Sequence, residues 1–273
     1  MTSKKLMIDC FIFYNEIDLL TYRLNILNEI IDYFIIVEST HTFVGKEKKL
    51  YFNENKHLYD DFKEKIIHII VKDMPYIYPN INISDNDQWK NENFQRNCII
   101  HGLNSIAQIN NDDIIIIGDA DEIPDPITLT EILLNNIKIE QIYNLEMDLY
   151  YYNLTTKNMD KWYQSKILSY KILKDMNVNI NDLFRLQDIP KIKNGGWHLS
   201  YFGDKCFIYN KLISFSHQEF NIPNITNLEN IQKNIETHND LFYRDIVFQK
   251  IKICNNKYLP IKYEIFLRKF YSD

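Results

Sequence analysis

Two aspartates separated by one residue, Asp119 and Asp121, directly follow a run of four isoleucines and a glycine. Such a run is too short for a helix and is typical of a strand buried on both faces of a parallel sheet. Ligands of open α/β sheets bind at the carboxyl ends of the strands, so these acids are expected at a binding site. Carboxylates are preferred ligands of Mg²⁺ and Mn²⁺, and a cation held here would neutralise a diphosphate. We therefore predict a metal site at Asp119 and Asp121.

A simpler interpretation is that acidic residues end the strand and cap the next helix. It accounts well for Asp125, which precedes Pro126 and an apolar, helical segment. It accounts poorly for Asp119, Asp121 and Glu122 together, because like charges beside a buried strand repel one another unless a cation pairs with them. The functional interpretation is preferred.

Composition indicates a compact globular protein. The chain has 273 residues, 45% of them hydrophobic, with only 6 Gly and 7 Pro, and is long enough for a sizeable core. The formal net charge of -6 provides no basic surface for nucleic acid, so no nucleic-acid partner is expected.

The chain carries no sign of membrane insertion or secretion. No stretch approaches the ~20 apolar residues that span a bilayer, and the first strand meets Asp9 too early for a signal peptide. The 4 cysteines are far apart and lack metal-ligand spacing. We expect a soluble, cytoplasmic protein with reduced, buried thiols and no membrane span.

The elements before Asp119 predict a parallel sheet. Residues 6–13 and 33–38 are apolar strands, and the segment between them has leucines at helical spacing, which makes a β-α-β unit. Residues 66–71 give a third strand, and a helix from about residue 91 leads into the strand of Asp119. The expected fold class is α/β, with a mostly parallel central sheet flanked by helices.

Two further residues are placed near the same sheet edge by these elements. Glu38 ends the second strand, where it could hydrogen-bond a base or ribose or, equally, cap a helix. Arg96 lies on the helix that precedes Asp119 and could reach a phosphate or uracil.

A second unusual stretch, residues 194–204, contains three of the six glycines beside Trp197 and Tyr201. Glycines let a backbone approach a ligand closely, and flat aromatic rings suit a sugar surface, although a packed turn is the alternative for Trp197. Asp204 then begins a helix, and His217 follows it. The imidazole could complete the metal's shell or favour the helix dipole.

Several ordered segments resemble glycosyltransferase family 17, the β-1,4-N-acetylglucosaminyltransferases. They run from Asp9 to about Glu219 and comprise residues 9–16, 37–46, 94–97, 118–124 and 196–200. The resemblance implies a GT-A type, Rossmann-like domain over 1–273. A nucleotide-sugar-binding half would cover about 1–125 and an acceptor-binding half about 126–273.

The resemblance also implies an inverting, metal-dependent transfer. The donor would be a UDP-sugar, UDP-GlcNAc above others, the ion Mn²⁺ or Mg²⁺, and the partner a glycan or glycoprotein acceptor joined by a β-1,4 linkage. Metal ligands would be Asp119, Asp121 and His217. Residues expected at the donor are Phe11, Tyr14, Asn15, Glu38, Arg96, Asp119, Ala120, Asp121, Gly196, Trp197 and His198.

The chain differs from the family's animal enzymes in having no Golgi membrane anchor and no lumenal cysteine pairs. This difference questions an N-glycan acceptor and favours a soluble bacterial or viral enzyme.

Inverting transfer also needs a carboxylate that takes the proton of the acceptor hydroxyl. We predict Asp204 in this role, with Glu219 and Asp148 as alternatives. Two other functions stay open: a catalytically inactive nucleotide-sugar- or glycan-binding protein, and a metal-dependent phosphohydrolase.

Overall fold

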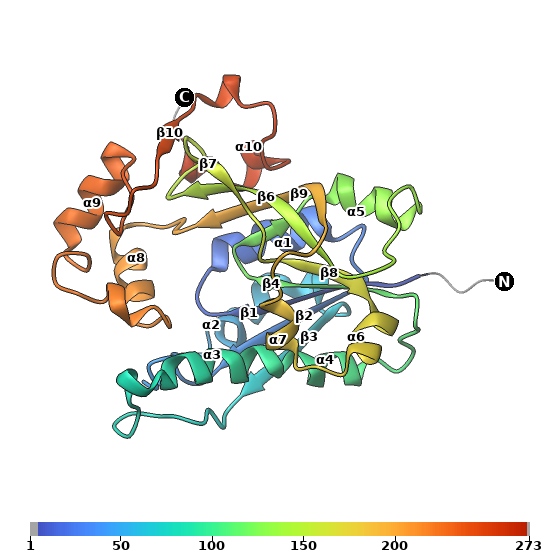
Figure 1. Cartoon of the computed structure of the whole chain (residues 1–273). Helices are drawn as coiled ribbons and strands as arrows, with labels where there is room; N and C mark the ends of the chain where they lie inside the picture. Colours follow the sequence, from blue (N-terminus) through green and yellow to red (C-terminus); the bar gives the residue numbers. More distant parts are fainter. Residues whose placement is uncertain (1–4, 272–273) are drawn as a thin grey trace.

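The structure is a computed structural model that describes residues 5–271. Within these residues ten strands form one sheet, in which β10-β7-β6-β8-β4-β1-β2-β3 are neighbours in that order, and β9 joins β5 and β6 (Figure 1). The strands are β1 Met7–Phe13, β2 Tyr33–Ser39, β3 Ile66–Val71, β4 Ile114–Asp119, β5 Glu122–Pro124, β6 Tyr143–Tyr151, β7 Thr156–Trp162, β8 Lys166–Ser169, β9 Lys191–Ser200 and β10 Phe248–Lys250.

The α-helices are mostly short. They are α1 Ile17–Leu27, α2 Tyr51–Glu54, α3 Asp87–Asn97, α4 Ile99–Ser105, α5 Pro126–Leu133, α6 Tyr170–Met176, α7 Ile180–Phe184, α8 Lys205–Leu212, α9 Leu228–Thr237 and α10 Tyr263–Phe266. The helix expected from residue 91 onward is divided at Cys98 into α3 and α4.

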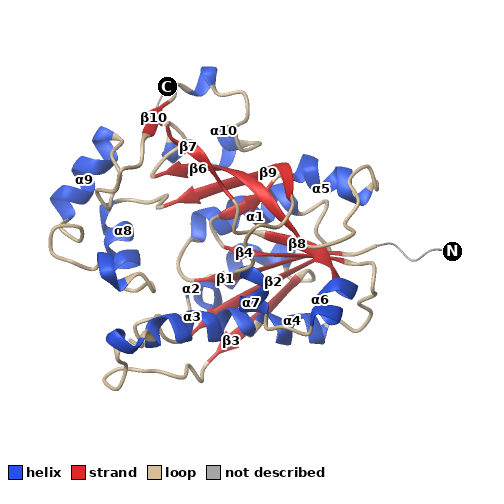
Figure 2. Ribbon diagram, in the orientation of Figure 1, coloured by secondary structure: helices blue, strands red, loops and turns tan. Residues whose placement is uncertain are grey.

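The parallel part of the sheet is as predicted. Strands β3, β2, β1 and β4 are adjacent and parallel, and Ile12 of β1 lies opposite Asp119 of β4. Figure 2 shows α3 and α4 on one side of these strands and α1 and α5 on the other. The predicted α/β fold class, with a central sheet flanked by helices, is confirmed.

The alternation of side chains along β1 and β4 explains why both strands are buried. Ile114 and Ile116 enter the apolar cluster that contains α1 and α5, whereas Ile115 and Ile117 enter the cluster on the α4 side. A strand covered on both faces needs apolar residues at every position, which the isoleucine run supplies.

The second half of the sheet is mainly antiparallel. β8 pairs antiparallel with β4 and β6, and β7 pairs antiparallel with β6 and β10. β9 runs parallel to β6 and antiparallel to β5. Helices α8 and α9, orange in Figure 1, pack on a third apolar cluster beyond the ends of β6 and β9.

Two other expectations meet different outcomes. Among the described residues no helix is long and apolar enough to cross a membrane. All four cysteines are free, and Cys10 and Cys98 are buried as expected, but Cys206 and Cys254 are exposed. The prediction of four buried thiols was wrong for these two because both lie on peripheral segments, α8 and a 3₁₀ turn near the C-terminus.

Candidate functional site

A cavity of about 300 Å³ lies between the carboxyl ends of β1 and β4 on one side and α8 on the other. Its walls combine acidic, basic and aromatic side chains, including Tyr14, Lys48, Arg96, Asp119, Asp121 and Lys211. The predicted edge of the parallel sheet is therefore the edge at which the structure has its cavity.

Asp119 and Asp121 both line this cavity, but their surroundings differ. Asp119 is the last residue of β4, and its side chain is 35% exposed, whereas that of Asp121 is 8% exposed. Burial and the carboxylates of Glu122, Glu92 and Asp121 raise the pKa of Asp119, against the opposing effect of Arg96. The negative charge at Asp119 is therefore incompletely compensated, and a further cation would be favourable there.

Glu122, the third acid of the turn, has a structural role. Its carboxylate accepts hydrogen bonds from the backbone N–H of Asp119 at 3.1 Å, from Ser165 Oγ at 2.6 Å and from Trp162 Nε1 at 2.5 Å. A Cβ on Gly118 would lie 2.6 Å from Ser165 Oγ and 3.0 Å from Glu122 Oε2, so a glycine is needed for this packing. These bonds hold the turn between β4 and β5 in shape.

Arg23 supports the same turn from beneath. The guanidinium, fully buried on α1, donates to both carboxylate oxygens of Asp9, at 2.7 and 2.6 Å. Its Nη1 donates to the backbone carbonyl of Asp119 at 2.8 Å and approaches that of Ala120 at 3.4 Å. The backbone that presents the two aspartates is thus fixed by a buried ion pair.

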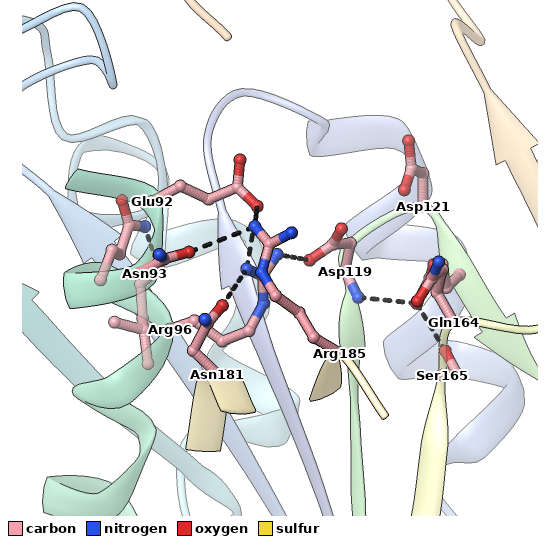
Figure 3. Close-up of polar contacts among 12 residues, drawn as sticks. Glu92, Asn93, Arg96, Asp119, Asp121, Gln164, Ser165, Asn181 and Arg185 are labelled. Carbon is pink, nitrogen blue, oxygen red and sulfur yellow. Dashed lines mark hydrogen bonds and ion pairs between the residues drawn. The ribbon is translucent and has the colours of Figure 1, made fainter. Parts of the chain in front are cut away.

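Arg96 is the centre of a polar network beside Asp119 (Figure 3). It donates to Asp119 Oδ1 at 2.9 Å, Glu92 Oε1 at 2.9 Å and Asn181 Oδ1 at 3.2 Å, and its guanidinium lies 4.2 Å from the ring centre of Phe184. Because these contacts engage both Nη atoms, Arg96 orients Asp119 as well as contributing to the wall of the cavity.

Asp121 is paired on its other side by groups from the second half of the chain. Lys211 Nζ, in the last turn of α8, lies 2.7 Å from Asp121 Oδ2, and His198 Nε2 of β9 lies 3.5 Å from Oδ1. Burial would raise the pKa of Asp121, but Lys211 and His198 outweigh it and hold this pKa far below its usual range. Asp121 is therefore a carboxylate anion in the folded protein.

The carboxylates fit a metal that is bound together with a phosphate ligand. No group of three His, Cys, Asp or Glu side chains within residues 5–271 is placed to hold a metal on its own. Mg²⁺ and similar ions are commonly held by one or two carboxylates plus substrate phosphates and water. Asp119 and Asp121 supply two such carboxylates, which meets this requirement but not that of a closed protein site.

The structure brings about half of the predicted site residues into the cavity. Those that line it are Tyr14, Arg96, Asp119, Ala120, Asp121, His198 and His217. Those that do not line it are Phe11, Asn15, Glu38, Asp148, Gly196, Trp197, Asp204 and Glu219. Phe11 is fully buried in the core, with the guanidinium of Arg23 4.2 Å from its ring centre. Asn15 lies in the turn before α1, with its side-chain oxygen buried.

Glu38 serves as a helix cap. Its carboxylate accepts hydrogen bonds from the backbone N–H groups of Phe52 and Asn53, at 3.0 and 3.3 Å, at the start of α2. His68 Nε2 lies 3.1 Å from the same carboxylate. Of the two roles that its position allowed, the geometry favours the cap.

Two of the three predicted proton acceptors are engaged elsewhere. Asp148 is buried in β6 and forms ion pairs with Lys157 and Lys161 of β7. Asp204 caps α8 by accepting a hydrogen bond from the backbone N–H of Phe207 at 2.8 Å.

The glycine pair makes room for neighbouring strands. A Cβ on Gly196, which has φ +143°, would lie 2.1 Å from the carbonyl oxygen of Ile123 in β5, and one on Gly195 would lie 2.7 Å from Leu145 Cβ in β6. Trp197 is fully buried and donates through Nε1 to the carbonyl of Tyr258 at 3.3 Å. These glycines permit a close approach between strands. For Trp197 the structure agrees with the alternative interpretation, that of a packed side chain.

His217 and Glu219 form a pair at the rim of the cavity. His217 Nδ1 lies 2.6 Å from Glu219 Oε1, and the imidazole lies edge-on to Trp89, with ring centres 4.6 Å apart. His217 therefore lines the cavity without joining Asp119 and Asp121 in a group of metal ligands.

Sequence patterns did not single out several residues of the site. Arg23, Lys48, Trp162 and Lys211 meet the turn or the cavity from separate elements, and no motif spacing connects them. Lys211 had one available signal, since it is the basic residue in the last turn of the helix predicted to begin at Asp204.

Comparisons with known proteins agree with the resemblance seen in the sequence. The family model described as glycosyltransferase family 17 matches residues 1–249. The β-1,4-mannosyl-glycoprotein 4-β-N-acetylglucosaminyltransferases of Homo sapiens and Rattus norvegicus are each 28% identical over 113 residues, which are 40% of this chain and 20% of theirs. The match thus spans about a fifth of the length of these relatives.

Among solved structures, 4-diphosphocytidyl-2C-methyl-D-erythritol synthase from Anaerococcus prevotii superimposes with a TM-score of 0.38 at 8% identity. The superposition covers 76% of this chain and 94% of that one. A superposition this loose supports no conclusion about function.

Proposed function

This chain belongs to glycosyltransferase family 17, and from that membership we propose that it transfers GlcNAc from UDP-GlcNAc to a hydroxyl of a glycan or glycoprotein acceptor. The transfer would invert the anomeric carbon and form a β-1,4 linkage. The names of the relatives support this choice of sugar and linkage. Family membership counts against a phosphohydrolase.

The observation that carries the proposal is the position of Asp119 and Asp121. Both carboxylates reach one cavity at the carboxyl edge of the parallel strands, where nucleotide ligands of open α/β sheets bind. Tyr14, directly after β1, and the Lys48 ammonium line the same cavity and are suited to the nucleotide and its phosphates.

Asp119 and Asp121 would hold Mn²⁺ or Mg²⁺ together with oxygens of the donor diphosphate. When bound, the ion would neutralise charge on the departing diphosphate. The chain's own contribution is to orient both carboxylates, through Arg96, Lys211 and the Arg23 brace, and to keep Asp121 anionic through Lys211. Such preorganised charge acts where the leaving group develops its negative charge.

The part of the cavity wall that comes from the second half of the chain suits a sugar. Its aromatic side chains are those of Tyr151, Trp162 and Tyr201. Trp162 is fixed by its hydrogen bond to Glu122 and lies 4.4 Å, centre to centre, from the ring of His198. Rigid aromatic faces bind sugar surfaces at a small entropic cost, so we assign the acceptor to this wall.

Of the three predicted proton acceptors, Glu219 has the contact that favours it. It is hydrogen-bonded to His217, which lines the cavity, whereas Asp148 and Asp204 are engaged in ion pairs and a helix cap. We therefore propose that Glu219 receives the proton of the acceptor hydroxyl by way of His217, whose imidazole lines the cavity.

The test of this role compares Glu219→Gln with Asp204→Asn. Glu219→Gln is expected to lower kcat by about 10²- to 10⁴-fold while UDP binding stays unchanged. Wild-type kcat in Glu219→Gln would exclude Glu219 from the role.

The test of the function is a donor screen with purified protein. A panel of nucleotide sugars is offered with varied sugar acceptors, in the presence of Mn²⁺ or a chelator, and release of free UDP is measured. We expect metal-dependent turnover of UDP-GlcNAc that is lost in Asp121→Ala and kept in Asp160→Ala, which changes an exposed aspartate of β7. Metal-dependent binding without turnover would favour the binding-protein alternative, and no interaction with any nucleotide sugar would refute the proposal.

A further inference from the structure

The ammonium group of Lys211 donates a hydrogen bond to Asp121, a proposed metal ligand. Nζ lies 2.7 Å from Asp121 Oδ2, while Asp121 Oδ1 has His198 Nε2 at 3.5 Å. Both oxygens of this carboxylate thus already have a protein neighbour. Asp119 differs, because its Oδ1 accepts from Arg96 while a third of its side chain remains exposed.

A divalent cation and this ammonium cannot both stay close to Asp121. Two positive charges about 4 Å apart repel strongly when a protein cavity lowers the effective dielectric constant. Binding of a metal to Asp121 therefore requires Lys211 to withdraw from Oδ2. In the protein without donor, the metal and Lys211 compete for one carboxylate.

Lys211 has another carboxylate nearby, but that group is largely engaged. Its Nζ lies 3.7 Å from Glu16 Oε1, and Glu16 Oε2 accepts the backbone N–H groups of Tyr14 and Asn15 at 3.1 and 3.0 Å. A donor diphosphate adds new negative charge to the same cavity. An ammonium on a flexible stem is suited to follow that charge.

We propose that Lys211 is an exchangeable counter-ion: it neutralises Asp121 in the donor-free protein and binds the donor diphosphate when a divalent cation replaces it on Asp121. The inference rests on the proposed function and adds a donor-binding residue to it. Its consequence is cooperative binding, because the diphosphate draws away the group that competes with the metal. By linkage, the metal must raise nucleotide affinity by the same factor as the nucleotide raises metal affinity.

A purely structural ion pair would look different. The Arg23–Asp9 pair is fully enclosed and uses both carboxylate oxygens. Lys211, by contrast, is 19% exposed, lines the cavity and makes one contact within normal hydrogen-bonding distance to Asp121. A flexible lysine stem with this exposure can carry its charge a short distance.

The experiment measures Mn²⁺ and UDP binding by calorimetry, with no acceptor present. For the wild type, saturating UDP is expected to raise Mn²⁺ affinity by roughly 5- to 150-fold. Lys211→Met is expected to bind Mn²⁺ about tenfold more tightly without UDP, and to bind UDP about tenfold more weakly in saturating Mn²⁺. Uridine, which lacks the diphosphate, should bind equally to both proteins.

Lys205→Met is the matched control, because it makes the same substitution at the other end of α8 and outside the cavity wall. It should leave both affinities unchanged, and thermal unfolding checks that each variant is folded. If Lys211→Met does not fold, the wild type decides: equal Mn²⁺ affinity with and without UDP overturns the proposal.

The outcomes separate this inference from the proposed function. A wild type that binds neither UDP nor Mn²⁺-UDP would refute the proposed function and with it the role of Lys211. Wild-type binding of UDP, combined with unchanged Mn²⁺ and UDP affinities in Lys211→Met, would overturn the role of Lys211 alone.

Discussion

At the scale of single residues, the cavity is organised by charge compensation. Asp119 is matched with Arg96, Asp121 with Lys211, and Glu92 with Arg96 and Arg185. Lys48 is the exception: its nearest carboxylate, that of Glu38, is 3.9 Å away, and its ammonium lies over the rings of Tyr14 and Tyr51. A cation left partly uncompensated is expected where an anion binds.

Lys48 should make stability depend on pH in the alkaline range. Burial lowers the pKa of Lys48 to about 8 from its ordinary 10.5, although Glu38 and Glu16 oppose the shift. Between these values the unfolded chain binds more protons at Lys48 than the folded one, so stability attributable to this group rises with pH there. Below pH 8 the buried charge costs up to about 3 kcal/mol.

Lys48→Met should therefore raise the free energy of unfolding at pH 7 and remove part of its increase between pH 8 and 10.5. Urea unfolding across this range measures both effects. Lys49→Met, at the exposed neighbouring position, is the control and should show neither. Lys166, whose pKa burial also lowers to about 8, accounts for a remaining increase. An unchanged pH profile in Lys48→Met would contradict the assignment.

At the scale of elements, the site depends on how β4 turns into β5. The Arg23–Asp9 pair joins α1 to β1 and holds the carbonyls of Asp119 and Ala120, while Glu122 holds the N–H of Asp119. The turn is thus fixed on both its carbonyl and its amide side by side chains from other elements. The rigidity of the turn therefore depends on α1, β1 and β5 together.

Breaking the buried pair should be costly, and removing both partners less so. Arg23→Met alone is expected to lower the free energy of unfolding by about 3–5 kcal/mol, because Asp9 is left buried without its cation. Asp9→Asn combined with Arg23→Met should recover part of this loss, measured as the coupling energy of a double-mutant cycle.

The exposed Lys171–Asp175 pair on α6 is a control for this cycle. Its removal should change stability by less than about 1 kcal/mol. Equal losses from the buried and the exposed pair would show that Arg23 does not brace the turn.

The elements differ in how well the sequence predicts them. β1, β2, β3 and β4 are continuous apolar runs with a local pattern, and they were predicted. β7 reads TKNMDKW and β8 has four residues, so neither has an apolar alternation. β9 contains Gly195 and Gly196, which suggested close approach to a ligand or a packed turn. These strands exist because β4 and β6 provide partners, which is tertiary information that single-sequence patterns lack.

The site shows the same limit. Asp119 and Asp121 were found because their position after a buried strand is a local signal. Lys211 and Arg23 meet that turn from 90 and 96 residues away in the chain, counted to Asp121 and Asp119 respectively. An ion pair between distant residues leaves no spacing to read, so these partners could not be predicted.

At the scale of the whole molecule, the C-terminal segment closes the core. Tyr258 donates to Asp125 at 2.8 Å and accepts from Trp197 through its carbonyl, and Tyr22 of α1 donates to the carbonyl of Ile261. Helix α10, red in Figure 1, packs on α1. The family model ends at residue 249, but the fold of this chain also includes the segment after it.

Leu267 tests this contribution, because it is fully buried among the N-terminal elements. Leu267→Ala is expected to lower the free energy of unfolding by about 2–5 kcal/mol. Ile265→Ala, two residues earlier and 70% exposed, should change it by less than about 0.5 kcal/mol. Chemical denaturation of both variants makes the comparison, and equal effects would mean that the segment is not part of the cooperative fold.

The pairing of β4 with β8 also has a consequence for synthesis on the ribosome. β1 covers one edge of the isoleucine strand early, but β8 begins at Lys166, 47 residues after Asp119. At about 5–20 residues per second, translation leaves the second edge uncovered for roughly 2–10 s. An open apolar strand edge is a template for pairing with another chain. During this interval the nascent polypeptide exposes the second edge of β4. Chaperone binding, lower temperature or a lower expression level should therefore increase the yield of folded protein.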